Sequence, residues 1–205
     1  MFLNGQIAAI GSDHPRYPAS LRSESAPAEF WAAGPLDILD RPRTGFFCSS
    51  QCPGAVILKA FDAVTAMRTE SQIVIGGFHS PMEWECLSIL LRGSQPVIWV
   101  PARSIPGMRL KPELAPAFNA GRLLILSPFH AKNRRITVGL AEERNRFVTA
   151  LADHIFVAHA APASRTLALC LELLRRNKPV FTVDDPSNQR LLECGAQPIR
   201  PSGWS

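Results

Sequence analysis

The stretch Gln72–Pro101, QIVIGGFHSPMEWECLSILLRGSQPVIWVP, carries two short apolar runs separated by a helix-like segment. Gln72–Gly76 and Pro96–Pro101 are rich in Val and Ile, which favour strands, whereas Pro81–Arg92 has the length and residue types of a helix. A proline is tolerated in the first turn of a helix, so Pro81 fits the beginning of this one. The order strand, helix, strand predicts two parallel strands joined by a crossover helix.

The same alternation extends outward from this unit in both directions. Strands are expected at Gly45–Ser49, Arg122–Leu126, His154–His159 and Pro179–Val183, with an extended piece at Gln197–Ile199. Helices are expected at Pro53–Arg68, Pro112–Asn119, Gly139–Ala150, Ser164–Arg176 and Ser187–Cys194. Because the strands are nearly continuous apolar runs, both faces of the sheet should be covered. The sequence therefore predicts an α/β fold, a Rossmann-like doubly wound, mostly parallel sheet with helices on both faces.

The first 42 residues do not show this alternation of strands and helices. Prolines recur in them, at Pro15, Pro18, Pro27, Pro35 and Pro42, and interrupt regular elements. We therefore expect three parts in the chain. Residues 1–42 form a mostly irregular arm with one short helix that packs on the sheet edge, 43–200 form the Rossmann-like domain, and 201–205 form a loose tail.

Bulk composition narrows the class of protein. The 205 residues carry a net charge of +5 with a pI near 9.3, which permits but does not demonstrate binding to nucleic acid or nucleotides. No apolar run reaches the ~18 residues of a membrane helix. The N-terminus lacks a signal-peptide pattern, so we expect a cytoplasmic location and no membrane contact.

The cysteines number five, an odd count that argues against a disulfide framework and favours free thiols. Cys48 and Cys52 have a spacing common in zinc pairs, but no second pair of ligands matches them. We therefore expect neither a metal nor a cofactor.

In parallel sheets, ligands bind beyond the carboxyl ends of the strands, so the loops after the strands are the candidate sites. After the first predicted strand, Ser49, Ser50 and Gln51 either hold an anion or cap the following helix. Gly76-Gly77 either permits close backbone approach or only makes a tight turn. His79 either contacts a phosphate or a base, or is an ordinary surface or core histidine.

Cations gather in the second half of the chain. Lys132, Arg134 and Arg135 lie in the loop after the fourth predicted strand. In the next helix Arg144 and Arg146 are two apart and cannot share a face, so one should point to the site and the other to structure or solvent.

Asn145, between these arginines, is a poor helix former, which favours a role in bonding a neighbouring loop. Pairing of Glu142 and Glu143 with the arginines is the competing explanation.

The turn Ser164-Arg165-Thr166 lies where the following helix begins. Ser164 or Thr166 can cap that helix, but capping does not explain the cation of Arg165. The predicted phosphate- or nucleic-acid-binding set is therefore Ser49, Ser50, Gln51, Gly76, Gly77, His79, Lys132, Arg134, Arg135, Arg144, Asn145, Arg146, Ser164, Arg165 and Thr166. No catalytic residues are predicted, because no nucleophile, Walker or dinucleotide-binding pattern occurs.

Five motifs in order resemble the Rossmann domain of the DprA/Smf DNA-processing proteins. They are Arg144-Asn145-Arg146, Ala152-Asp153 leading into the strand Ile155–His159, Ser164-Arg165-Thr166-Leu167, Lys178-Pro179-Val180-Phe181 and Leu191–Ala196. Tyr17-Pro18-x-x-Leu21 and Trp31-x-x-Gly34 resemble the stretch before that domain. The resemblance covers nearly the whole chain. It implies a non-enzymatic protein that binds and protects single-stranded DNA and helps to load a recombinase, its implied partner; a homodimer stays open.

The chain departs from that family at its site. Ser49-Ser50-Gln51 replaces a Gly-Ser-Arg turn whose arginine holds phosphate, Arg165 replaces a glycine and His159 replaces a glutamate. We hypothesise that Arg165, Arg134 and Arg135 supply the lost cation. The family's C-terminal winged helix is not expected here. Bases can stack on an exposed ring such as Phe78, Phe129 or Trp84, although Trp84 is expected in the core.

Two alternatives remain open. One is a nucleotide-binding sensor, because related Rossmann domains hold nucleotides at the same strand ends. The other is a nucleotide phosphoribohydrolase of the LOG type, whose threonine falls on Thr166 but whose glutamate falls on Leu169. Since that carboxylate is missing, the enzyme is the least favoured of the three.

Overall fold

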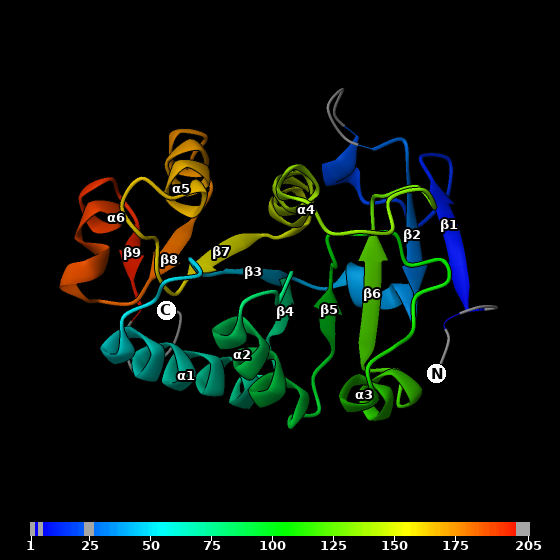
Figure 1. Ribbon diagram of the computed structural model, residues 1–205, viewed down its shortest axis with the longest axis horizontal. Helices are drawn as coiled ribbons and strands as arrows, with labels where there is room; N and C mark the ends of the chain where they lie inside the picture. The colour runs from blue at the N-terminus through cyan, green and yellow to red at the C-terminus, as the bar shows by residue number, and fades with distance from the viewer. Residues whose placement is uncertain (1–2, 4–5, 23–26, 200–205) are drawn as a thin grey trace.

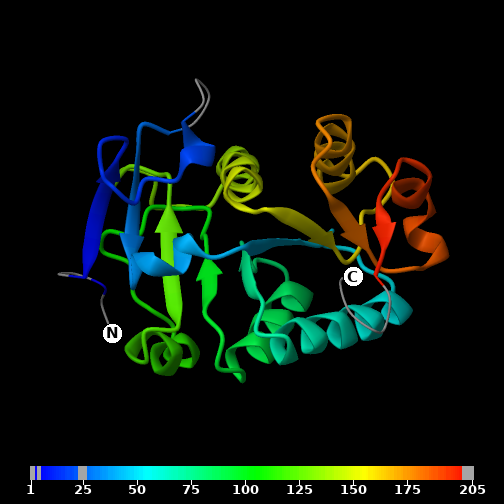
Figure 2. The ribbon, with the colours of Figure 1, turned by 180° about the vertical axis from the view of Figure 1, so that it is seen from behind.

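The computed structural model describes Leu3, residues 6–22 and residues 27–199, which form one nine-stranded sheet. The strands lie in the order β1-β2-β6-β5-β4-β3-β7-β8-β9, with β1 and β9 at the two edges (Figures 1 and 2). Their bounds are β1 Ile7–Gly11, β2 Glu29–Ala33, β3 Arg43–Phe47, β4 Ile73–Gly76, β5 Val97–Trp99, β6 Leu123–Ser127, β7 His154–Val157, β8 Val180–Thr182 and β9 Gln197–Pro198.

Every neighbouring pair from β6 to β9 is parallel. All residues of β4 and β6 are buried, as expected of parallel strands covered on both faces. The predicted Rossmann-like doubly wound fold is therefore confirmed. Because β3 lies between β4 and β7, the strand order reverses there, and the carboxyl ends of β3 and β7 make the switch point at which such sheets bind ligands.

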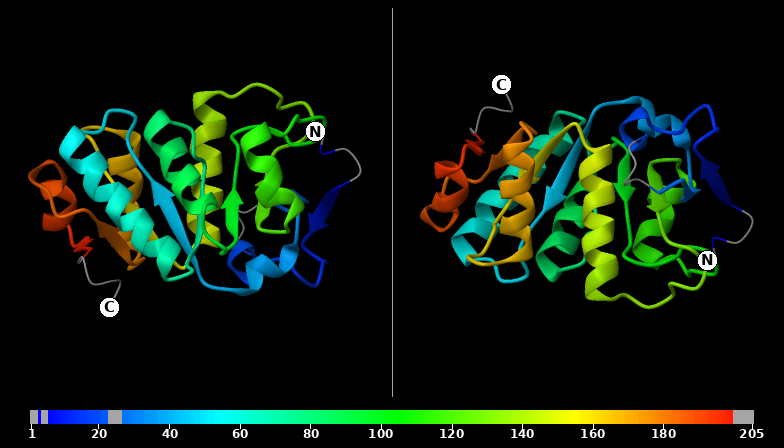
Figure 3. Two further views of the ribbon diagram at one scale, coloured as in Figure 1. Left: turned by 90° about the horizontal axis from the view of Figure 1, so that it is seen from below. Right: turned by 90° about the horizontal axis from the view of Figure 1, so that it is seen from above.

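Helices cover both faces of the sheet (Figure 3). One core lies under α1, α2 and α3 and contains Val64 and Leu87, and the other lies under α4 and α5 and contains Phe147 and Cys170. The helices are α1 Gly54–Thr69, α2 Pro81–Leu91, α3 Ala115–Asn119, α4 Val138–Leu151, α5 Arg165–Arg175 and α6 Gln189–Glu193. Short 3-10 turns are Ala19–Leu21, Leu36–Asp40, Pro112–Leu114 and Pro186–Asn188.

The N-terminal segment corrects one expectation. It is not mostly irregular, because β1 and β2 form an antiparallel pair and β2 pairs with β6, so the segment extends the sheet. Its helical turns are the 3-10 segments at Ala19–Leu21 and Leu36–Asp40. Pro27 and Pro35 flank β2 without interrupting its hydrogen bonds, which is why the proline-rich sequence still forms a strand. The division at residue 42 stays a prediction, and 201–205 lie outside the described residues.

Candidate nucleic-acid interface

The loops after β3 and β7 are joined by hydrogen bonds at the switch point. Ser49 Oγ donates to Ser164 Oγ over 3.2 Å and accepts from the backbone N–H of Ala161 over 3.0 Å. Ser164 Oγ also accepts from the backbone N–H of Leu167, and so it, rather than Thr166, caps α5. Ser49 is buried, and its contacts tie the two loops together.

Ser50 and Gln51 are exposed next to these hydrogen bonds between the two loops. The alternative that Ser49-Ser50-Gln51 caps the next helix is wrong, because α1 begins at Gly54 after Pro53 and has no side-chain cap. The hydroxyl of Ser50 and the amide of Gln51 make no hydrogen bond to another described residue. Both side chains are therefore accessible to a ligand at the switch point.

Arg144 and Arg146 diverge as their spacing predicts, since Arg144 is 6% exposed and Arg146 is exposed. Arg144 Nη1 donates to the carbonyl of Val100 over 3.1 Å, and Nε donates to Asn145 Oδ1 over 2.7 Å. Asn145 thus orients its neighbour and does not bond a loop. Burial lowers the pKa of Arg144, and the charge of Glu83 partly opposes that shift.

Gly77 leaves room for that guanidinium, which occupies the place that a β-carbon on this residue would take. Neither Gly76 nor Gly77 has a positive φ. For Gly76-Gly77 the sequence left open either close approach to the backbone or only a tight turn. Close approach accounts for Gly77, and the group that approaches is the side chain of Arg144.

Glu83 was not among the predicted site residues. It is buried, and its carboxylate accepts hydrogen bonds from the backbone N–H groups of Cys48 at 3.2 Å, His79 at 2.8 Å and Ser80 at 3.0 Å. Ser80 in turn caps α2 by accepting from Glu83 N, which completes a capping box. The signal that could have identified Glu83 is Ser80-x-x-Glu83 before an apolar helix.

The cations of the loop between β6 and α4 are open to solvent. Lys132, Arg134 and Arg135 are exposed, and none forms an ion pair with a described carboxylate. The loop is held to the one after β5, because Ser104 N donates to the carbonyl of Asn133 over 2.8 Å.

Arg165, in contrast, pairs with Glu142 over 2.7 Å, with side chains that are 69% and 41% exposed, respectively. Glu142 therefore pairs with this arginine on α5 and not with Arg144 or Arg146. The charge of Arg165 is therefore partly neutralised, whereas the charges of Lys132, Arg134 and Arg135 are not neutralised by a described carboxylate.

A cavity of about 380 Å³ opens beyond the carboxyl ends of β4 and β5. Three of the predicted site residues, Gly77, His79 and Arg144, lie in its wall, whereas Ser49 and Ser164 meet at the switch point. Trp84, expected in the core, is half-buried here, whereas Phe78 and Phe129 are buried and are not exposed stacking rings. The other residues lining the cavity are Phe78, Ser80, Pro81, Glu85, Trp99, Pro101, Ala102, Lys111 and Ile136.

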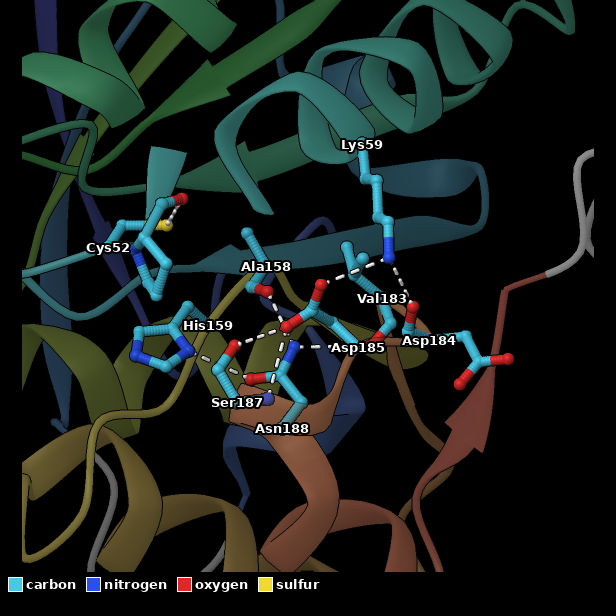
Figure 4. Close-up of polar contacts among 10 residues, drawn as sticks. Cys52, Lys59, Ala158, His159, Val183, Asp184, Asp185, Ser187 and Asn188 are labelled. Atoms are coloured by element: carbon cyan, nitrogen blue, oxygen red, sulfur yellow. Dashed lines mark hydrogen bonds and ion pairs between the residues drawn. The ribbon is translucent and has the colours of Figure 1, made fainter. Parts of the chain in front are cut away.

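A second polar cluster joins the carboxyl ends of β7 and β8 to α1 (Figure 4). The buried Asn188 accepts from His159 Nδ1 and Ala160 N, and it donates to the carbonyls of Ala158 and Val183. His159, which replaces the family's glutamate, is therefore buried and used structurally.

In the same cluster Lys59 Nζ donates to Asp185 Oδ2 over 3.0 Å and to the carbonyl of Asp184 over 2.8 Å. Hydrogen bonds from Ser187 and from Lys59 lower the pKa of Asp185 to about 2. The cluster fixes the loop after β8 against α1.

Within the described part of the chain, no three His, Cys, Asp or Glu side chains are grouped so that they could hold a metal. The cysteines there are free thiols, and burial raises the pKa of Cys170 to about 12. None of the described helices has the length and apolar character needed to cross a membrane.

Comparison with known proteins identifies relatives. A family model described as DNA recombination-mediator protein A matches residues 8–201. The fold is similar to DNA processing protein A from Streptococcus pneumoniae, with a TM-score of 0.79 and 18% identity over 95% of this chain and 71% of that one. It is also similar to DNA processing protein A from Helicobacter pylori, described for its single-stranded DNA binding mode, with a TM-score of 0.79 and 17% identity over 98% of this chain and 95% of that one.

A molybdenum cofactor binding protein from Rippkaea orientalis shares the fold less closely, with a TM-score of 0.55 and 14% identity over 79% of this chain and 91% of that one. No curated protein matches the sequence. These structural likenesses concern the fold, whereas the family model spans nearly the whole chain. The chain therefore belongs to the DNA recombination-mediator protein A family, a family of DNA-processing proteins.

Proposed function

We propose that this protein binds single-stranded DNA along the carboxyl edge of its sheet, without carrying out a reaction on it. The observation that supports this most directly is the set of uncompensated cations Lys132, Arg134 and Arg135 on one exposed loop. Phosphate contacts dominate the affinity of proteins for nucleic acids, and a cation that is not paired with a carboxylate is available to make such a contact. Ile136 and Arg144 line the same cavity, so this loop borders the cavity wall that holds the buried guanidinium.

The family supports the same proposal. Membership links the chain to DNA processing, and the related Helicobacter pylori protein is described as binding single-stranded DNA. A recombinase as partner, a homodimer and a cytoplasmic location are further parts of the proposal.

The test measures fluorescence anisotropy of a labelled oligo-dT strand across a range of salt concentrations. We expect the triple variant Lys132→Ala, Arg134→Ala, Arg135→Ala to bind weakly and to lower the salt slope by about 2, because each lost contact to a single strand removes roughly 0.7. The matched control replaces three exposed cations at the other end of the domain by Ala and should bind like the natural protein. They are Arg175 on α5, Arg176 directly after α5 and Arg190 on α6. Equal losses in both variants would indicate only a response to net charge.

The variant Arg165→Ala separates this proposal from the hypothesis that Arg165 replaces the family's arginine. Because Glu142 already pairs with Arg165, we expect its loss to weaken binding less than the loss of any loop cation. If charge reversal at Arg165, Arg134 and Arg135 together left binding and its salt slope unchanged, the hypothesis of replacement would be wrong.

A further inference from the structure

The cavity next to Gly77 has aromatic walls. The rings of Trp84 and Trp99 have centroids 6.3 Å apart and lie nearly perpendicular, at 78°. Trp99 Nε1 donates to the carbonyl of Gly77 over 3.1 Å, which fixes the orientation of that ring. A volume of about 380 Å³ lies within the range of protein sites that hold small organic ligands. The walls therefore suit a flat, ring-containing ligand.

The cavity also holds positive charge that the protein does not neutralise. Arg144 is 6% exposed and forms no ion pair with a described carboxylate, and no described acceptor takes a hydrogen bond from its Nη2. Glu83 lies near enough to affect Arg144 electrostatically, but its oxygens accept from backbone N–H groups. A buried cation whose hydrogen-bond partners are all uncharged is costly, so an anion beside it would be bound favourably.

Lys111 and Glu85 complete the charges around the cavity. Lys111 Nζ lies 3.6 Å from the centroid of the Trp84 ring, and it too lacks a carboxylate partner among the described residues. Stacking of a base on an aromatic ring contributes more than an exposed ammonium over that ring. A base could therefore displace Lys111 from Trp84 and leave its ammonium free for a phosphate. Glu85 is exposed at the cavity and carries the opposite charge.

We infer that this cavity binds one nucleotide unit, with its base against Trp84 and Trp99 and its phosphate at Arg144. The inference rests on the proposed function and deepens it, since Ile136 of the basic loop forms part of the same cavity wall. A strand held by that loop would pass the cavity and could insert one base. The same chemistry is offered by a free nucleotide, so the experiment must separate the two sources.

The experiment compares oligo-dT with an abasic strand of equal length, which has the phosphates without the bases. We expect the natural protein to bind oligo-dT on the order of ten-fold more tightly. Trp84→Ala should abolish this preference while leaving the affinity for the abasic strand unchanged, and Trp84→Phe, which keeps a ring, should restore part of it. Trp31→Phe, which removes a tryptophan outside the cavity, should behave like the natural protein.

Two further measurements test the cavity. Tryptophan fluorescence of the natural protein tests it even if Trp84→Ala does not fold, because oligo-dT should quench the fluorescence and the abasic strand should not. A rise in melting temperature with dTMP that Trp84→Ala lacks would assign the cavity to free nucleotides. A preference for oligo-dT over the abasic strand without a dTMP shift would assign it to a nucleotide of the strand.

The two proposals fail in different ways. If oligo-dT and the abasic strand bind the natural protein equally and dTMP gives no shift, the cavity inference is overturned while binding to single strands stands. If neither strand binds, the proposed function is wrong, and only a dTMP shift that depends on Trp84 would retain the cavity as a nucleotide site.

Discussion

A β-carbon on Gly77 would lie 1.2 Å from Nη1 and 1.9 Å from Cζ of Arg144. The buried guanidinium of α4 therefore occupies the space that any side chain after β4 would need. This relationship explains why a glycine follows the strand at a position whose backbone conformation does not demand one. It also means that the position of the cation is set by two segments that are distant in sequence.

Gly77→Ala should displace Arg144. The backbone at Gly77 tolerates alanine, so the effect comes from the clash, and overpacking of this kind costs about 1–3 kcal/mol. Denaturant unfolding should give a lower midpoint than for the natural protein. Gly139→Ala in α4 is the control, because nothing lies within 4 Å of its added β-carbon, and alanine in a helix can add up to about 1 kcal/mol of stability. Equal midpoints for Gly77→Ala and the natural protein would mean that Arg144 is free to move.

Glu83→Gln should destabilise the turn between β4 and α2. The carboxylate accepts from three backbone N–H groups through both oxygens, whereas an amide has one oxygen and leaves at least one donor unpaired. A buried unpaired donor costs about 1–3 kcal/mol. The control is Glu85→Gln on the same helix, because Glu85 is exposed and should unfold with the natural midpoint. Similar losses in the two variants would show that helix charge, and not the hydrogen bonds, matters.

The parts of the fold that follow a repeated pattern were predictable from sequence. The apolar runs of β4 and β6 and the proline at the start of α2 are local signals, and the structure has these elements where they were expected. β1 and β2 were missed because their stability comes from pairing with each other and with β6, which a proline-rich sequence does not reveal. Strand formation depends on such context more than helix formation does.

The candidate site was predictable only in part. The spacing of Arg144 and Arg146 indicated that the two side chains would point in different directions, because that depends on helix geometry alone. Trp84 was expected in the core, and its half-buried side chain does pack against the core under α1, α2 and α3. It also lines the cavity, because loops distant in sequence border that part of α2. The pairing of Arg165 with Glu142 likewise joins two different helices, α5 and α4, and no local pattern encodes it.

Asn188→Ala should be among the more destabilising substitutions outside the apolar cores. Its amide is buried and bonds four groups at the ends of β7 and β8, all of which would lose a partner together (Figure 4). Loss of a buried network commonly costs about 2–4 kcal/mol. Thermal and denaturant unfolding of this variant should be compared with those of Gln189→Ala, whose side chain is exposed on the next residue. If the two variants have equal midpoints, the network does not hold the strand ends together.

Asp185→Asn should make the free energy of unfolding depend less on pH in the acidic range. The hydrogen bonds from Ser187 and Lys59 lower the pKa of Asp185 from its ordinary 3.8 to about 2 in the folded chain. Because the folded-state pKa is the lower one, the ionised carboxylate stabilises the fold above about pH 4, and this contribution is lost as the pH falls toward 2. The difference in unfolding free energy between the natural protein and Asp185→Asn should therefore shrink over that interval.

Asp184→Asn is the matched control for this pH series. Lys59 contacts the backbone carbonyl of Asp184, which the substitution keeps, and in Figure 4 the carboxylate of Asp184 points away from Lys59. We expect Asp184→Asn to follow the acid unfolding of the natural protein. A gap between Asp185→Asn and the natural protein that stays constant from pH 6 to pH 2 would show that the charge of Asp185 contributes nothing, and that only its hydrogen-bond geometry holds the loop after β8 against α1.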